Sequence, residues 1–112
     1  MKVTTIINNT EYELSTSLRV AYNIQGCHNH KPYAEVFKNI GDMPLEKQIE
    51  ILFESFKIAN PEVAVTFNKI AFQNYYLDNF KLKQVMDQLQ AVIQGIMGDD
   101  FEELAEPAEQ GN

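Results

Sequence analysis

The sequence predicts an α+β fold that is mostly α, with an N-terminal β-hairpin, a compact bundle of about five helices and a disordered acidic C-terminal tail. Three observations lead to this prediction. β-Branched and aromatic residues are concentrated in residues 3–14, apolar residues recur at helical spacing through residues 18–97, and acidic residues gather at the end. We expect one hairpin-plus-helices domain over residues 1–98 and a flexible tail over residues 99–112.

The hairpin prediction rests on two short runs, "VTTII" and "TEYEL", separated by Asn8 and Asn9. Asparagine tolerates the positive φ of a two-residue turn, and such a turn fixes the register of the strands. The expected pairs are Val3 with Leu14, Thr5 with Tyr12, and Ile7 with Thr10. One face then carries Val3, Ile7, Tyr12 and Leu14. A lone two-stranded ribbon is marginal in water, so it must pack on helices or pair its edge with another chain. Strand addition at this edge would make a self-association site of Val3, Thr5, Ile7 and Tyr12.

Helices are predicted at approximately residues 18–25, 33–40, 45–59, 62–80 and 82–97. In the first helix, the apolar spacing selects Leu18, Ala21, Tyr22 and Gln25. The third helix has the clearest stripe: Leu45, Ile49, Leu52, Phe53 and Phe56. Its carboxylates Glu46, Glu50 and Glu54 lie off that stripe beside Lys47 and Lys57. We therefore expect these acids to be solvated, whereas acid–base catalysis needs a buried carboxylate of raised pKa.

The predicted helix over residues 62–80 is apolar on more than one side and rich in aromatic residues. These are Phe67, Phe72, Tyr75, Tyr76 and Phe80. They form either part of the core or a partner-binding surface, because Phe and Tyr are favoured anchors at protein interfaces. Tyr75 and Tyr76 are about 100° apart around a helix, so at least one of them is expected to reach the surface.

The only cysteine and both histidines lie together in "CHNH", as Cys27, His28 and His30. A structural zinc site usually needs four ligands in spaced pairs on separate elements, and a Cys–His catalytic pair also draws on separate elements. A polar loop is the simpler interpretation. With no phosphate-binding loop or nucleophile motif elsewhere, we expect a protein that is not an enzyme and binds no metal or cofactor.

The formal charge of −7 is placed unevenly, since residues 99–112 contribute −6 and leave −1 for residues 1–98. Nucleic-acid binding needs clustered Lys and Arg, and the nine basic residues here are scattered. No apolar segment is long enough to span a membrane, and the N-terminal residues contain no apolar run of the kind found in signal peptides. We therefore expect a cytoplasmic protein with neither nucleic acid nor membrane as its partner.

The string that precedes the first helix also suggests a family. Ile7, Asn9, Tyr12, Glu13 and Leu14 form an "I-x-N-x-x-Y-E-L" pattern, followed by a small helical remainder and an acidic end. In outline the chain resembles the tail assembly chaperones of long-tailed (siphovirus-type) phages, or prophages, of Gram-positive bacteria. The aromatic-rich 62–80 segment and the "CHNHKP" loop depart from that family's pattern.

The resemblance implies a non-enzymatic viral protein that binds the tape measure protein during tail assembly and helps recruit tail tube protein. It further implies a protein that often self-associates as a homo-oligomer, acts in the cytoplasm of the bacterial host and is absent from the mature virion. A second hypothesis is a small regulatory module of the antitoxin or anti-repressor type, whose acidic tail binds a basic partner.

Overall fold

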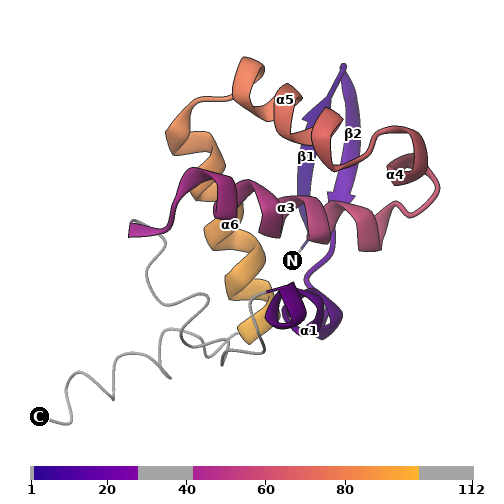
Figure 1. Cartoon of the computed structure of the whole chain (residues 1–112). Coiled ribbons are helices and arrows are strands. Elements are labelled where there is room, and N and C mark those ends of the chain that lie inside the picture. The colour runs from indigo at the N-terminus through magenta and orange to yellow at the C-terminus, as the bar shows by residue number, and fades with distance from the viewer. Residues whose placement is uncertain (1, 28–41, 99–112) are drawn as a thin grey trace, which may run out of the picture.

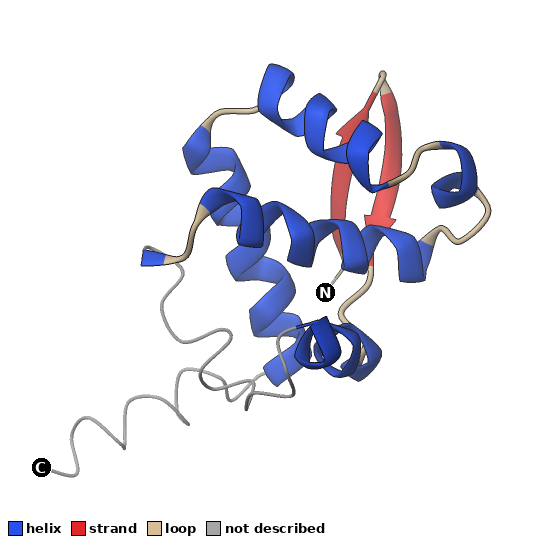
Figure 2. Cartoon of the chain, in the orientation of Figure 1, coloured by secondary structure: helices blue, strands red, loops and turns tan. Residues whose placement is uncertain are grey.

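The computed structural model describes residues 2–27 and 42–98, and it contains an N-terminal hairpin followed by five helices (Figures 1 and 2). The predicted α+β, mostly α fold is therefore confirmed. The strands are β1 (Val3–Ile7) and β2 (Thr10–Leu14). The helices are α1 (Leu18–Cys27), α3 (Leu45–Ala59), α4 (Val63–Thr66), α5 (Lys69–Asn79) and α6 (Leu82–Met97). The helix predicted over residues 33–40 and the acidic tail lie outside the described residues.

The hairpin has the predicted register, with Val3 opposite Leu14, Thr5 opposite Tyr12, and Ile7 opposite Thr10. The turn residues have φ values of 53° at Asn8 and 66° at Asn9, which is the left-handed region that this two-residue turn requires. The inner face packs on the helices through buried side chains. They are Val3, Thr5, Ile7 and Leu14, with Tyr12 partly buried beside them.

Helix α3 is the centre of the fold, because β2, α1, α5 and α6 all contact it (Figure 1). Ile49, Leu52, Phe53 and Phe56 are buried as predicted, whereas Leu45 at its first turn is partly exposed. The helix is also covered on its polar side, where Gln48, Glu54 and Ser55 are buried. Ser55 fastens α3 to the end of the hairpin: its carbonyl accepts from the amide of Ser15 at 3.1 Å and its hydroxyl donates to the Ser15 carbonyl at 2.6 Å.

The prediction of one continuous helix over residues 62–80 is wrong. The chain leaves helical geometry at Phe67 (φ −94°, ψ 76°), which closes α4, and restarts at Asn68. The Asn68 side chain accepts a hydrogen bond from the amide of Ala71 at 3.0 Å and so caps the start of α5. This break sets the orientation of α5 independently of α4.

The buried face of α1 differs from the predicted one. Val20, Ala21 and Ile24 are buried, whereas Leu18 and Tyr22 are exposed. Only Ala21 belongs to both sets, because the sequence of this helix offers two apolar stripes and packing on α3 and α6 uses the other one.

Helix α6 buries Val85, Leu89, Val92 and Ile93. The last turns of α6 lie against Thr16, two residues before α1 begins. A Cβ atom built at Gly95 would lie 2.5 Å from Cγ2 of Thr16. In the described part of the chain, no helix is long and apolar enough to cross a membrane.

Candidate interaction surfaces

Two of the five aromatic residues of the 62–80 segment, Phe72 and Tyr76, belong to the buried core. Phe72 is fully buried and Tyr76 is 1% exposed. The two rings stack at 4.4 Å between centroids, and Phe72 also contacts the α3 rings of Phe53 at 5.3 Å and Phe56 at 5.1 Å. A role in direct partner binding is therefore wrong for Phe72 and Tyr76. These two residues are buried because they pack against the α3 side chains Phe53 and Phe56.

The other three aromatic residues, Phe67, Tyr75 and Phe80, are partly buried and surround this pair. Tyr75 contacts Phe67 edge to face at 6.3 Å and Phe80 at 6.0 Å. Its hydroxyl accepts a hydrogen bond from the amide of Asn8 at 2.9 Å, so it also holds the tip of the hairpin. Of the two adjacent tyrosines, Tyr75 is the one nearer the surface, and an internal contact already uses its hydroxyl.

A closed ring of hydrogen bonds joins α5, α6 and β1 inside the fold. The hydroxyl of Tyr76 donates to Oε1 of Gln88 at 2.7 Å, and Nε2 of Gln88 donates to Oγ1 of Thr5 at 3.2 Å. The remaining contact, 2.8 Å between the hydroxyls of Thr5 and Tyr76, closes the ring with Thr5 as donor. Burial raises the pKa of Tyr76 well above its usual range, so the phenol stays protonated.

The predicted self-association edge has its side chains turned inward. Val3, Thr5 and Ile7 are buried in the chain's own core, and Tyr12 packs edge to face on Phe56 at 5.5 Å. A second chain could therefore meet this hairpin through its backbone groups or through its outer face, where Ile6 is 58% exposed.

The two backbone edges of the hairpin differ. On β2, the carbonyl of Glu13 accepts from Nδ2 of Asn60 at 2.9 Å, and the next amide, that of Ser15, donates to α3. Because the pairs alternate between bonded and non-bonded along an antiparallel ladder, the outward-facing amides of β1 are those of Thr4 and Ile6. Neither has a hydrogen-bond partner among the described residues. Self-association through this edge remains a prediction.

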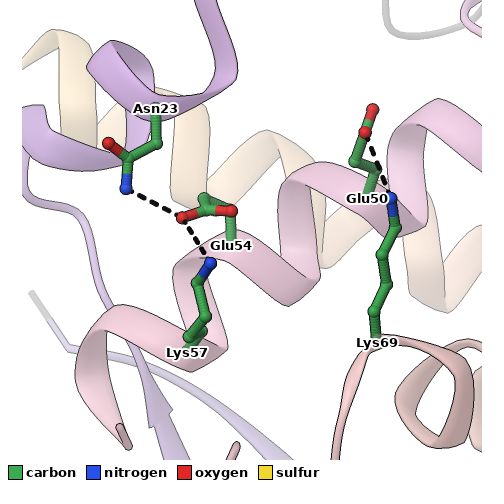
Figure 3. Close-up of polar contacts among 5 residues, drawn as sticks. All are labelled: Asn23, Glu50, Glu54, Lys57 and Lys69. Atoms are coloured by element: carbon green, nitrogen blue, oxygen red, sulfur yellow. Dashed lines mark hydrogen bonds and ion pairs between the residues drawn. The ribbon is translucent and has the colours of Figure 1, made fainter. Parts of the chain in front are cut away.

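The carboxylates of α3 are less solvated than their spacing predicts (Figure 3). Glu54 is only 8% exposed, because α1 packs over it. Its Oε2 accepts from Nδ2 of Asn23 at 2.8 Å and lies 3.3 Å from Nζ of Lys57. Glu50 pairs with Lys69 of α5 at 3.3 Å and ties the two helices together. The expectation of a fully solvated acidic face is wrong for Glu54, which has a structural hydrogen-bonding role.

The apolar surface that remains exposed is largely aliphatic. On α5, Ile70 is 69% exposed and Leu77 is 50% exposed, and Val65 of the preceding α4 is 78% exposed. Ile70 and Leu77 are seven residues apart, so they lie two turns apart on one side of α5. We call Ile70 and Leu77 the α5 outer face. A second exposed pair, Leu18 and Tyr22, lies on α1.

The "CHNH" stretch is described only in part. Cys27 is the last residue of α1, while His28 and His30 lie outside the described residues. Among the described residues, no three of the types His, Cys, Asp and Glu come together in a way that could hold a metal ion. The expectation of a polar loop is therefore wrong for Cys27, which ends a helix, and it stays a prediction for His28 and His30.

No protein-family model matches the chain, and the comparisons with curated proteins and with solved structures also gave no match.

Proposed function

We propose that this protein is a phage tail assembly chaperone that binds the tape measure protein and helps recruit the tail tube protein. The proposal begins with the resemblance carried by Ile7, Asn9, Tyr12, Glu13 and Leu14. It is a function of binding surfaces, without a catalytic residue or a cofactor. The protein acts in the cytoplasm of the bacterial host and is left out of the mature virion.

The observation that carries the proposal is the α5 outer face. Exposed aliphatic residues two turns apart on one helix suit docking against another amphipathic helix, which uses the same spacing. A tape measure protein is a long helical rod, so its apolar stripe offers this spacing repeatedly. Asp78 flanks the face and is exposed, whereas Lys69 on the other side of the face is paired with Glu50. An acidic group is therefore available at the rim.

The first experiment is affinity capture of the tagged protein from its native host after prophage induction, with identification by mass spectrometry. We expect a very long, coiled-coil-rich protein together with a tail tube subunit. Capture of a small basic protein that depends on residues 99–112 would instead favour the antitoxin or anti-repressor hypothesis. Purified virions should lack the protein.

The contact itself is tested with the double substitution Ile70→Asp and Leu77→Asp. Both side chains are exposed, so the fold should persist while capture of the long protein falls at least about tenfold, as expected when a central apolar contact is lost. Leu82→Asp is the matched control, because Leu82 is also exposed (57%) but belongs to α6. Equal capture of the long protein by the unmodified protein, the double variant and Leu82→Asp would show that the α5 outer face is not the binding surface.

A further inference from the structure

A second apolar surface lies at the opposite end of the molecule, on α1 (Figure 1). Leu18 and Tyr22 are one turn apart and are 72% and 71% exposed. Together with Ser17 and Arg19 they line a surface hollow. We call Leu18, Arg19 and Tyr22 the α1 patch. The opposite side of the same helix is in the core, so the patch is not needed for packing within the described fold.

The chain leaves the described fold close to this patch. Gly95, in the last turn of α6, lies against Thr16, and Thr16 is two residues before Leu18. Helix α6 ends two residues later, at Met97, and Gly98 is its C-cap. Gly98, the last described residue before the segment 99–112, therefore lies near the first turn of α1. Fourteen residues can extend up to about 45 Å, and α1, with ten residues, is only about 15 Å long.

The composition of residues 99–112 complements the patch. The segment has six acidic residues and no basic one, and its two large apolar residues are Phe101 and Leu104. Arg19 is the only charged residue in α1, and the first turn of α1 holds no acidic residue. Carboxylates are therefore attracted both by Arg19 and by the partial positive charge at the start of the helix. Phe101 and Leu104 can cover Leu18 and Tyr22.

We propose that residues 99–112 bind the α1 patch of their own chain, with Phe101 and Leu104 on Leu18 and Tyr22 and the carboxylates beside Arg19. The acidic segment then acts as an internal ligand that keeps this apolar surface from other proteins. The inference does not depend on the proposed function, because the patch lies on α1 and the proposed partner surface lies on α5.

The test uses the full-length chain carrying Phe101→Trp. The protein has no tryptophan, so the introduced indole can be excited selectively and reports on its own surroundings. Acrylamide quenching of its fluorescence is compared with and without Leu18→Ser and Tyr22→Ser. A short tether gives an effective concentration in the millimolar range, so even a contact of millimolar affinity is populated about half of the time. We therefore expect these two substitutions to raise the quenching constant about twofold.

Three further measurements complete the test. Arg19→Gln and added salt should each raise the quenching constant, whereas Ile70→Ser, which removes an equally exposed residue on α5, should leave it unchanged. Far-UV circular dichroism checks that each variant is folded. The proposal is refuted if quenching is the same with and without the α1 substitutions. It is also refuted if protection appears only as the protein concentration rises, since the segment would then bind a second copy.

Discussion

Tyr76→Phe tests whether the buried hydrogen-bond ring specifies how α5 and α6 pack on the hairpin. The substitution removes the hydroxyl oxygen and keeps the aromatic ring that stacks on Phe72. It takes away the acceptor of the Thr5 hydroxyl at 2.8 Å and the donor to Oε1 of Gln88 at 2.7 Å.

The expected cost follows from the burial of the two partners. Leaving a buried polar group without a partner costs about 1–3 kcal/mol, because water cannot take the lost place. Thr5 is 2% exposed, so its hydroxyl bears most of that penalty, although it still accepts from Gln88. Gln88 is only partly buried, so water can replace its lost donor. We expect Tyr76→Phe to reduce the free energy of unfolding by about 2 kcal/mol.

The assay is urea unfolding followed by far-UV circular dichroism, with an unchanged denaturant slope as the check that the transition stays two-state. Tyr75→Phe is the matched control. Its hydroxyl accepts from the exposed amide of Asn8, where water can substitute, so we expect a loss of about 0.5 kcal/mol. Thr5→Val combined with Tyr76→Phe should cost less than the sum of the single changes, by about 1 kcal/mol.

Two results would refute this reasoning. A loss for Tyr76→Phe no larger than that for Tyr75→Phe would mean that the internal ring contributes no more than a surface hydrogen bond. Strict additivity with Thr5→Val would mean that the two hydroxyls do not stabilise one another.

Three further predictions follow from the backbone and from the buried phenol. Gly95→Ala should lower the thermal midpoint, because the added methyl meets Thr16 and overpacking costs about 1–3 kcal/mol. Gly26→Ala is its control; among the described residues, no atom beyond its own stretch of helix lies within 4 Å of the new methyl, so the change should raise the midpoint by relieving a glycine cost of about 0.5–1 kcal/mol. At Asn9, where φ is 66°, replacement by Gly should preserve urea stability and replacement by Val should lower it by about 1–2 kcal/mol. Burial raises the pKa of Tyr76 above its ordinary value of 10.0, so the unfolded chain loses this proton first. Stability from this group is therefore complete below about pH 10 and falls above it, by up to about 1.4 kcal/mol per pH unit, and Tyr76→Phe should abolish that part of the slope in urea titrations.

The hairpin could be predicted in detail because its determinants are local. Asn8 and Asn9 fix the turn type, the turn fixes the register, and strict alternation fixes the inward face. The division between α4 and α5 also has a local signal, the capping residue Asn68. The apolar pattern continues on both sides of Asn68, so an interpretation based on periodicity alone predicted one helix where the structure has two.

Other features depend on neighbours that no local pattern reveals. The polar side of α3 is covered because neighbouring elements surround that helix, and Glu54 is buried because α1 packs over it. The stretch "LRVAYNI" carries two apolar stripes. Which of them faces inward is decided by packing on α3 and α6, so the sequence could not show that Leu18 and Tyr22 would be exposed.

Substitutions on the inner side of α5 test the stability of the fold, whereas substitutions on its outer side test the proposed partner binding. Phe72 and Tyr76 face the core, so a charged substitution at Tyr76 should unfold the protein, and a loss of partner binding caused by it would say nothing about an interface. Ile70 and Leu77 are exposed, so we expect a charged substitution there to leave the core packing intact. A binding defect at these two positions, with unfolding midpoints unchanged, would therefore report on the partner surface itself. The sequence pattern indicated this segment because of its aromatic residues. In the structure two of them are buried, so the binding test uses the exposed aliphatic residues Ile70 and Leu77 instead.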